Sequence, residues 1–184
     1  MNETLKTIAE RHTTRSFTGT PIAPEELDAI LLAGAQAPTA GNSQRFRLIA
    51  IDDKQLIEEL DERMLASFAA ANPEMAERMK DRGGKALYNA SAVIFIAIEN
   101  SGPWSAELDC GIVVENMALA ASSLDVANCI HAMSRVLFEG EAGEEMKQRL
   151  QFPEGFVFGV ALLLGYPTDF GQAHAPALDK IIRI

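Results

Sequence analysis

The chain has 184 residues, of which 48% are hydrophobic, so it is long and apolar enough to bury a core. Its formal net charge of −10 at pH 7 argues against nucleic acids and anionic membranes as partners. The longest apolar runs, Ala92–Ile98 and Phe156–Leu164, are too short to span a bilayer. We expect a single domain over residues 1–184, in which a local group of basic side chains holds any anionic ligand.

The first part of the chain predicts two helices. Its opening stretch, MNETLKTIAERH, lacks the basic and then apolar order of a signal peptide, so we expect a cytoplasmic protein. Thr4–His12 is expected to be helical, with Leu5 and Ile8 on its apolar side. A second helix is expected to begin at Pro24, because proline suits the first helical turn, and to end near Pro38.

The rest of the chain alternates between apolar strands and helices. Short continuous apolar runs predict strands that are buried on both faces. Strands are expected at Phe46–Ile51, Ala92–Ile98 and Phe156–Gly165, and a strand or strand-like loop at Val126–Met133. Helices are expected at Lys54–Ala71, Leu108–Leu124 and Glu141–Leu150. This order predicts layers of helices on a mixed sheet.

The predicted helix Leu108–Leu124 carries more apolar surface than one face of a sheet normally covers. Its side chains turn by about 100° per residue, so its polar residues fall on two narrow stripes and the remaining arc is apolar. One stripe holds Asp109, Asn116 and Ser123, and the other holds Glu115 and Ser122. This segment is either the central core helix of a monomer, or it packs on its own core on one side and on a second subunit on the other.

A short basic segment follows the first predicted helix. Arg11 and Arg15 are four residues apart, with His12 and Thr13 between them. Guanidinium groups form charge-assisted, bidentate hydrogen bonds to phosphate, so this segment is a candidate phosphate clamp. The alternative is that these basic residues simply end a helix, where positive charge is favourable.

A tight polar loop, Ala37–Gln44, joins the second predicted helix to the first predicted strand. Asn42 and Gln44 each offer a hydrogen-bond donor and an acceptor, which suits the edge of a heterocyclic ligand. The alternative is a plain turn, because Gly, Asn and Ser are common turn residues.

Several common catalytic machineries are missing from the sequence. No G-x-G-x-x-G follows a predicted strand and no G-x-x-x-x-G-K-[ST] is present, which excludes Rossmann and P-loop sites. The three histidines lack metal-ligand spacing, so no metal site is expected. Cys110 and His131 could form a nucleophilic pair, although Cys110 on the apolar arc is better explained as a buried residue. A phosphate clamp and an amide-rich loop without an acid–base pair indicate chemistry done by a bound cofactor.

Four segments in this order resemble the FMN-dependent nitroreductase family. Arg11–Phe17 reads RHTTRSF, which matches the family pattern R-[RH]-[ST]-x-[RK]-x-F. Ala37–Phe46 reads APTAGNSQRF and is similar to A-P-[ST]-x-x-N-x-Q-P-W. Asp109–Leu124 resembles the long helix at the family's dimer interface, and Leu164–Pro167 resembles its L-G-[YF]-P. The resemblance spans nearly the whole chain.

The resemblance implies a set of cofactor-binding residues and no catalytic side chain. Those implied to hold the FMN phosphate and ribityl chain are Arg11, His12, Thr13 and Arg15. Those implied to reach the flavin ring or shape the loop beside it are Asn42, Gln44, Pro38 and Thr39. His131 falls in Asn128–Met133, which matches the region whose backbone lines the flavin.

The chain departs from the family pattern at two places. Arg45 and Phe46 stand where the family has Pro-Trp, at the wall of the expected pocket. Ala175–Lys180 stands where many members have a basic residue before K-P-L-E-E, which completes their phosphate site. Either His174 replaces that basic residue or the N-terminal arginines hold the phosphate alone.

The resemblance further implies an α+β fold, a mixed sheet flanked by helices, and a homodimer with two flavins at its interface. The implied function is that of an FMN-dependent NAD(P)H oxidoreductase, in which hydride passes through flavin N5 to a nitroaromatic, a quinone or a similar acceptor. NADH or NADPH would be the electron donor. One alternative is a flavin-binding protein without efficient turnover, with a sensor or storage role. Another is a thiol-dependent acyl-transfer enzyme that uses Cys110 and His131.

Overall fold

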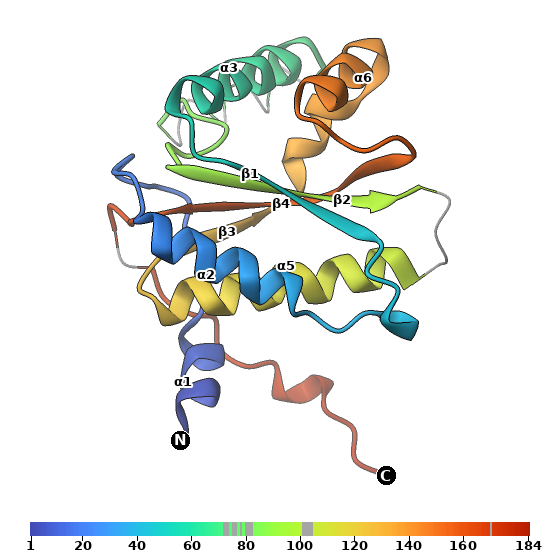
Figure 1. Ribbon diagram of the computed structural model, residues 1–184. Helices are drawn as coiled ribbons and strands as arrows, with labels where there is room; N and C mark the ends of the chain where they lie inside the picture. Colours follow the sequence, from blue (N-terminus) through green and yellow to red (C-terminus); the bar gives the residue numbers. More distant parts are fainter. Residues whose placement is uncertain (72–73, 75–76, 78, 80–82, 101–104, 170) are drawn as a thin grey trace.

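The fold is a four-stranded sheet with helices on both faces (Figure 1). The computed structural model describes residues 1–184 apart from 72–73, 75–76, 78, 80–82, 101–104 and 170. The strands lie in the order β1-β2-β4-β3. They are β1 (Phe46–Ile51), β2 (Ala92–Glu99), β3 (Ala127–His131) and β4 (Phe156–Gly165). Every strand predicted from the sequence is therefore present.

All three strand pairings are antiparallel, so the prediction of a mixed sheet was wrong for the described strands. Val93 pairs with Ile51, which means that β2 begins beside the residue where β1 ends. The connection through α3 thus returns to the same end of the sheet, whereas a parallel crossover would deliver the chain to the opposite end. Among the described residues, the only parallel pairing is the isolated bridge between Thr13 and Asn128.

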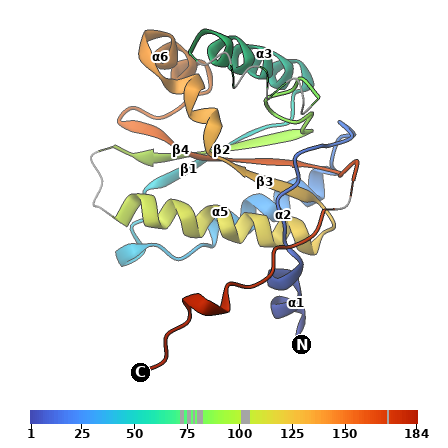
Figure 2. The same ribbon diagram turned by 180° about the vertical axis from the view of Figure 1, so that it is seen from behind.

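In the described part of the chain, two helices cover each face of the sheet (Figures 1 and 2). One face carries α2 (Pro24–Ala35) and α5 (Ser105–Ser123), and the other carries α3 (Lys54–Ala71) and α6 (Gly140–Arg149). The short helix α1 (Glu3–Glu10) lies beneath α5. Single 3-10 segments are η1 (Ala40–Asn42), η2 (Ala132–Phe138) and η3 (Leu178–Lys180).

Apolar residues fill both spaces between the sheet and the helices. Strand β2 serves both, because its successive side chains point to opposite faces and Ala92–Ile98 is buried throughout. The cluster on the α3 side includes Leu60, Met64, Phe68 and Phe95. The cluster on the α5 side includes Ile94, Ile96, Val113 and Met117. The buried, two-faced strand predicted from the run AVIFIAI is confirmed.

Helix α5 packs closely on the sheet because a glycine faces it. A Cβ atom on Gly159 of β4 would lie 2.7 Å from the Sγ atom of Cys110, so no larger residue fits there without a shift. The sequence prediction of a long, largely buried helix over Leu108–Leu124 is confirmed, with bounds that differ by a few residues. Cys110 is a buried packing residue, as its place on the apolar arc indicated.

The ends of the chain leave apolar side chains in solvent. In α1, Leu5 and Ile8 are 53% and 52% exposed, although the amphipathic pattern predicted there is present. The C-terminal tail runs away from the sheet (Figure 1), and Ile182 on it is 84% exposed. No helix in the described part of the chain is long and apolar enough to cross a bilayer.

Candidate functional site

The basic segment Arg11–Arg15 runs as an extended chain beside β3. Helix α1 ends at Glu10, and the backbone of Arg11 is already extended, with φ −56° and ψ 129°. Thr13 then bridges to Asn128, and the Thr14 N–H donates to the Asn128 carbonyl at 2.9 Å. Side chains alternate along an extended chain, so Arg11, Thr13 and Arg15 share one side.

The guanidinium group of Arg11 contacts a carboxylate at Nε and lacks a hydrogen-bond partner at Nη1 among the described residues. Its Nε lies 3.4 Å from Oε1 of Glu115 on α5, and its side chain is 20% exposed. Its Nη1 atom is buried, and no described residue forms a hydrogen bond with it. A buried guanidinium donor without a partner is unfavourable, so an anion at this position would satisfy it.

Arg11 and Arg15 both lie near the buried thiol of Cys129. Burial raises the pKa of the Cys129 thiol to about 11, and the nearby guanidinium groups of Arg15 and Arg11 oppose that rise. That the two arginines form a phosphate clamp stays a prediction. Arg15 is exposed and free to turn toward a ligand.

His12 lies on the other side of the extended segment. Its Nδ1 is 2.9 Å from the Glu10 carbonyl oxygen, and its ring lines a hollow of about 580 Å³ together with Thr14 and Tyr166. The Thr14 hydroxyl is buried and has no hydrogen-bond partner among the described residues. The structure therefore does not place His12 with the two arginines, and its predicted role at a cofactor stays a prediction.

His131 packs into the core on the α3 side. Its ring meets the Tyr88 ring edge-on, with 5.5 Å between centroids, and its Nδ1 is 2.8 Å from the Ser134 hydroxyl. Burial, together with the smaller effect of the Arg15 charge, lowers the pKa of His131 to about 4, so the imidazole is neutral at pH 7. In this position its side chain supports the start of η2.

The amide-rich loop is anchored to α5. The Ala40 N–H donates to Oδ1 of the buried Asp109 at 3.0 Å, and the Gln44 N–H donates to the Thr39 hydroxyl at 3.0 Å. Asn42 and Gln44 both adopt a left-handed backbone, with φ of 52° and 49°, which costs energy for residues other than glycine. Gly41 and Asn42 are consecutive left-handed residues, as in a type I′ turn, so the plain turn stays an alternative to a binding role for this loop.

The structure does not bring the basic segment and the amide-rich loop together within one chain. Glu115 contacts the first and Asp109 holds the second, and these anchors are about 9 Å apart along α5 at 1.5 Å per residue. In both ribbon views α1 lies near the end of α5, whereas η1 lies near its beginning (Figures 1 and 2). The predicted binding residues thus lie in two separate groups along α5.

The two departures from the family pattern have simple structural outcomes. Arg45 forms an ion pair with Glu99 at 2.8 Å across the β1–β2 edge, and Phe46 is buried in the core. His174 is exposed in the tail, where its Nδ1 is 2.9 Å from the Ala175 carbonyl oxygen. This contact does not place His174 at the basic segment of its own chain.

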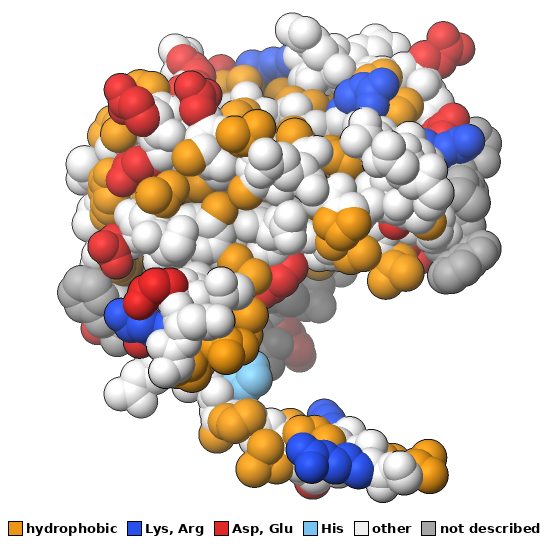
Figure 3. Space-filling view, turned by 60° about the horizontal axis from the view of Figure 1, so that its bottom comes forward, with side chains coloured by type: hydrophobic (Ala, Val, Ile, Leu, Met, Phe, Trp, Pro, Cys, Tyr) orange, Lys and Arg blue, Asp and Glu red, His pale blue; other side chains and the backbone are white. Residues whose placement is uncertain are grey.

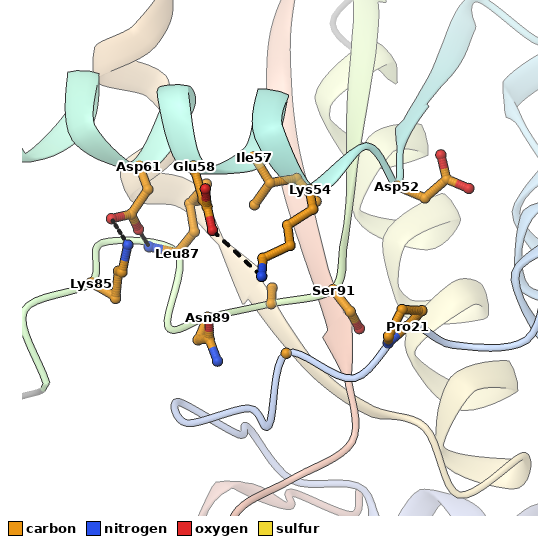
Figure 4. Close-up of a pocket in the computed structure, with 12 residues that line it drawn as sticks. Pro21, Asp52, Lys54, Ile57, Glu58, Asp61, Lys85, Leu87, Asn89 and Ser91 are labelled. Carbon is orange, nitrogen blue, oxygen red and sulfur yellow. Dashed lines mark hydrogen bonds and ion pairs between the residues drawn. The ribbon is translucent and has the colours of Figure 1, made fainter.

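A second polar site, the α3 pocket, was not predicted from the sequence. It is a cavity of about 60 Å³ between α3 and the turn at residues 85–91 (Figure 4). Asp61 is its central group, with a side chain that is only 4% exposed. One carboxylate oxygen accepts the Leu87 N–H at 2.7 Å, and the other lies 3.8 Å from Nζ of Lys85. Burial raises the pKa of Asp61, while Leu87 and Lys85 act in the opposite direction.

A signal for this pocket was present in the sequence. Asp61 shares the inward face of the helix with Ile57, Met64 and Phe68, and a carboxylate on an apolar stripe needs a partner. The structure supplies that partner from the chain itself. No group of histidine, cysteine, aspartate or glutamate side chains suited to a metal occurs in the described ranges.

Neither cysteine is placed as a nucleophile. Cys110 packs against Gly159 on the α5 side of the sheet, and His131 packs against Tyr88 on the other side. Burial also raises the pKa of Cys110 to about 11, with a further contribution from Glu107, so its thiolate is scarce at neutral pH. This geometry argues against the thiol-dependent alternative.

Known proteins resemble this chain over its whole length. The nitroreductase family model matches residues 8–166. A nitroreductase from Desulfitobacterium hafniense DCB-2, solved with bound FMN, is 38% identical, has a TM-score of 0.95, and the match covers 100% of this chain and 99% of that one. An FMN-bound nitroreductase from Bacteroides fragilis NCTC 9343 is 27% identical, has a TM-score of 0.87 and is covered over 100% of both chains. The NAD(P)H FMN reductase of Bacillus subtilis (strain 168) is 26% identical over 98% of this chain and 72% of its own length.

Proposed function

Because this chain belongs to the nitroreductase family, we propose that it is an FMN-dependent oxidoreductase that uses NADH or NADPH as electron donor. Bound FMN would supply the redox chemistry, accepting hydride from the nicotinamide and passing it through N5 to a nitroaromatic, a quinone or a similar acceptor in ping-pong order. The role of the protein is then to bind and orient FMN and the substrates. This role needs no acid–base pair at the described site.

The observation that carries this proposal is the open donor on Arg11. Its Nη1 is buried and lacks a partner among the described residues, and Arg15 adds a second positive charge close by. In a chain with a net charge of −10, two guanidinium groups at one place are a local exception that suits an anion. The residues present therefore fit the phosphate of FMN, with Thr13 on the same side to meet the ribityl chain.

We propose that the amide-rich loop completes the site from a second copy of the chain. Asn42 and Gln44 carry the donors and acceptors that suit a flavin ring, and they lie at the far end of α5 from their own Arg11. A two-fold homodimer that packs on α5 would place the loop of one protomer beside the basic segment of the other.

The apolar surface supports a dimer. Exposed apolar side chains occur on α1, on the outer side of α5 and along the tail, and they include Leu5, Ile8, Leu108, Leu124, Ile181 and Ile182. Figure 3 shows such side chains on the lower face of the molecule and on the projecting tail. A surface of this kind is typical of an obligate interface, in which protomer stability depends on association. Light scattering that finds a folded monomer at micromolar concentration would contradict the proposed dimer.

Anaerobic titration tests the redox function directly. Purified protein that carries FMN is expected to be yellow and to bleach when NADH or NADPH is added, and to regain colour when a quinone or nitroaromatic follows. Comparison of the two donors gives the preference between them. A yellow protein that neither donor bleaches would instead support a flavin-binding protein without turnover.

Mixed dimers test the shared site. Arg15→Ala and Asn42→Ala each damage both sites of a homodimer, but a heterodimer of the two variants retains one site with all its residues. Co-expressed variants are therefore expected to recover FMN binding that each variant alone has lost. If the heterodimer binds FMN no better than the homodimers, the amide-rich loop and the basic segment do not meet across the interface.

A further inference from the structure

We infer that Glu115 is a positioning residue for the phosphate site, because it holds the Arg11 guanidinium by its Nε edge and leaves Nη1 directed at the place of the phosphate. This inference rests on the proposed function. It assigns a role to a helix residue that lies outside the basic segment and would not itself touch the cofactor. The ion pair of 3.4 Å between Nε and Oε1 is the contact that carries it.

The backbone on both sides of this ion pair is fixed. Arg11 follows α1, and its N–H donates to the Thr7 carbonyl at 2.9 Å. Glu115 stands on α5, whose neighbouring residue Val114 is buried and whose Asn116 donates to the Ala33 carbonyl at 3.1 Å. The arginine side chain is therefore the mobile part, and Glu115 restricts it from a rigid helix.

The arrangement of the N–H donors on Arg11 favours the view that Glu115 positions the guanidinium and does not simply neutralise its charge. Arginine has five N–H donors on two edges, so a carboxylate at Nε does not block the donors on Nη1. The structure agrees with this division of the donors, because Nε lies 3.4 Å from Glu115 while Nη1 forms no hydrogen bond with the described residues. Fixing a long side chain before the ligand arrives reduces the entropy lost on binding.

The two possible effects of Glu115 have opposite signs. If it positions Arg11, its removal weakens FMN binding because the guanidinium becomes disordered. If it acts mainly as a nearby negative charge, its removal strengthens FMN binding because repulsion with the phosphate is relieved. Riboflavin has no phosphate, so its binding depends on neither effect. The ratio of FMN affinity to riboflavin affinity therefore measures the effect of Glu115 on the phosphate alone.

The experiment measures FMN and riboflavin affinity of the apo protein by quenching of flavin fluorescence. Glu115→Ala is expected to weaken FMN binding roughly three- to tenfold and to leave riboflavin binding unchanged. Glu115→Gln keeps the length of the side chain but removes the negative charge of the ion pair, so it is expected to weaken FMN binding as Glu115→Ala does. Glu107→Ala removes an exposed carboxylate from the same helix without touching Arg11, and it is expected to bind FMN as the wild type does.

A double-mutant cycle shows whether Glu115 acts through Arg11. In the Arg11→Ala background, Glu115→Ala is expected to have no further effect on FMN affinity. Unchanged or tighter FMN binding by Glu115→Ala, an equal loss of riboflavin binding, or a loss that persists in the Arg11→Ala background would each overturn the inference. Failure of the proposed function is seen separately, since the wild type would then show no preference for FMN over riboflavin.

Discussion

The Arg11 site and the α3 pocket both hold a charged group away from solvent, but they differ in how that group is satisfied. In the α3 pocket, Oδ1 of Asp61 accepts the Leu87 N–H, and Oδ2, which is buried and forms no hydrogen bond with the described residues, lies 3.8 Å from the Lys85 ammonium. At Arg11, Glu115 meets one edge of the guanidinium, and no described residue reaches the buried Nη1. The unpaired oxygen of Asp61 thus faces an opposite charge of its own chain, whereas the unpaired Nη1 of Arg11 has no acceptor among the described residues and is the candidate for contact with an anion.

The largest expected effect is a loss of stability when Asp61 in the α3 pocket is replaced. Asp61→Ala leaves the Leu87 N–H without its acceptor, and we expect the free energy of unfolding to fall by about 2–3 kcal/mol. Urea unfolding measures this loss. The ratio of FMN to riboflavin affinity should stay as in the wild type, because α3 lies across the sheet from α5.

Asp61→Asn is the matched control for that prediction. The amide oxygen can still accept from Leu87, and it avoids the cost of a buried charge, so this variant should lose much less stability than Asp61→Ala. If Asn and Ala are equally damaging, the attraction between Asp61 and Lys85 is the main contribution and the hydrogen bond is minor. A changed FMN-to-riboflavin ratio in either variant would break the contrast between the two regions.

At the basic segment, a substitution is expected to weaken FMN binding and to leave the stability of the protein unchanged. Arg15→Ala should weaken FMN binding by about ten- to a hundredfold, since a hydrogen bond to a charged group contributes about 1.5–3 kcal/mol. Riboflavin binding and the free energy of unfolding of the apo protein should change little, because Arg15 is exposed and carries no structural contact that its loss would leave unpaired in the described part of the fold. Fluorescence titration with both flavins checks this; FMN affinity equal to that of the wild type would mean that Arg15 does not contact the phosphate.

A smaller effect is expected from pH through His131. Its pKa falls from 6.5 to about 4 on burial, so its stabilising contribution is present above about pH 6.5 and is lost as the pH falls toward 4. When the pH is lowered from about 7 to about 5, the unfolded chain takes up a proton at His131 and the folded protein does not. The free energy of unfolding should therefore fall by about 2 kcal/mol. His131→Phe keeps a ring against Tyr88 and cannot be protonated, so its stability should fall less over that range. Equal slopes for both proteins in urea unfolding would refute this role.

The smallest effect is expected from the rim of the α3 pocket. Lys54 and Glu58 form an ion pair of 3.8 Å one helical turn apart, and both side chains are mostly in solvent. Surface pairs of this kind contribute little, so Lys54→Ala should change the free energy of unfolding by less than about 0.5 kcal/mol. A loss comparable with that of Asp61→Ala would mean that the rim, and not the buried carboxylate, holds the pocket together.

Much of the fold could be predicted because it depends on local patterns. Phe46–Ile51 and Phe156–Gly165 are strands as expected, since continuous apolar runs suit a sheet that is covered on both faces. The direction of the strands could not be predicted in this way. It depends on where each connection returns to the sheet, and Val93 beside Ile51 shows a return that the order of helices and strands does not reveal.

The candidate site was predictable as a list of residues and not as an arrangement. Patterns within a few residues indicated Arg11 and Arg15 as one group and Asn42 and Gln44 as another, and the structure keeps each group together. Their separation along α5 is a tertiary property with no local signal. The contribution of Glu115 was equally hidden, because its stripe on the helix suggests only a polar residue.

Helix α5 also limits how this chain can change in length. Its rise of about 1.5 Å and turn of about 100° per residue set the relation between Asp109, which holds the amide-rich loop, and Glu115, which contacts Arg11. One residue inserted between them would rotate one of these anchors away from its contact while leaving the helix itself intact. Substitutions in this stretch can be absorbed by local repacking, but an insertion or deletion would change the position of the amide-rich loop relative to the basic segment. Natural variation in this stretch is therefore expected to occur by replacement of residues at constant length.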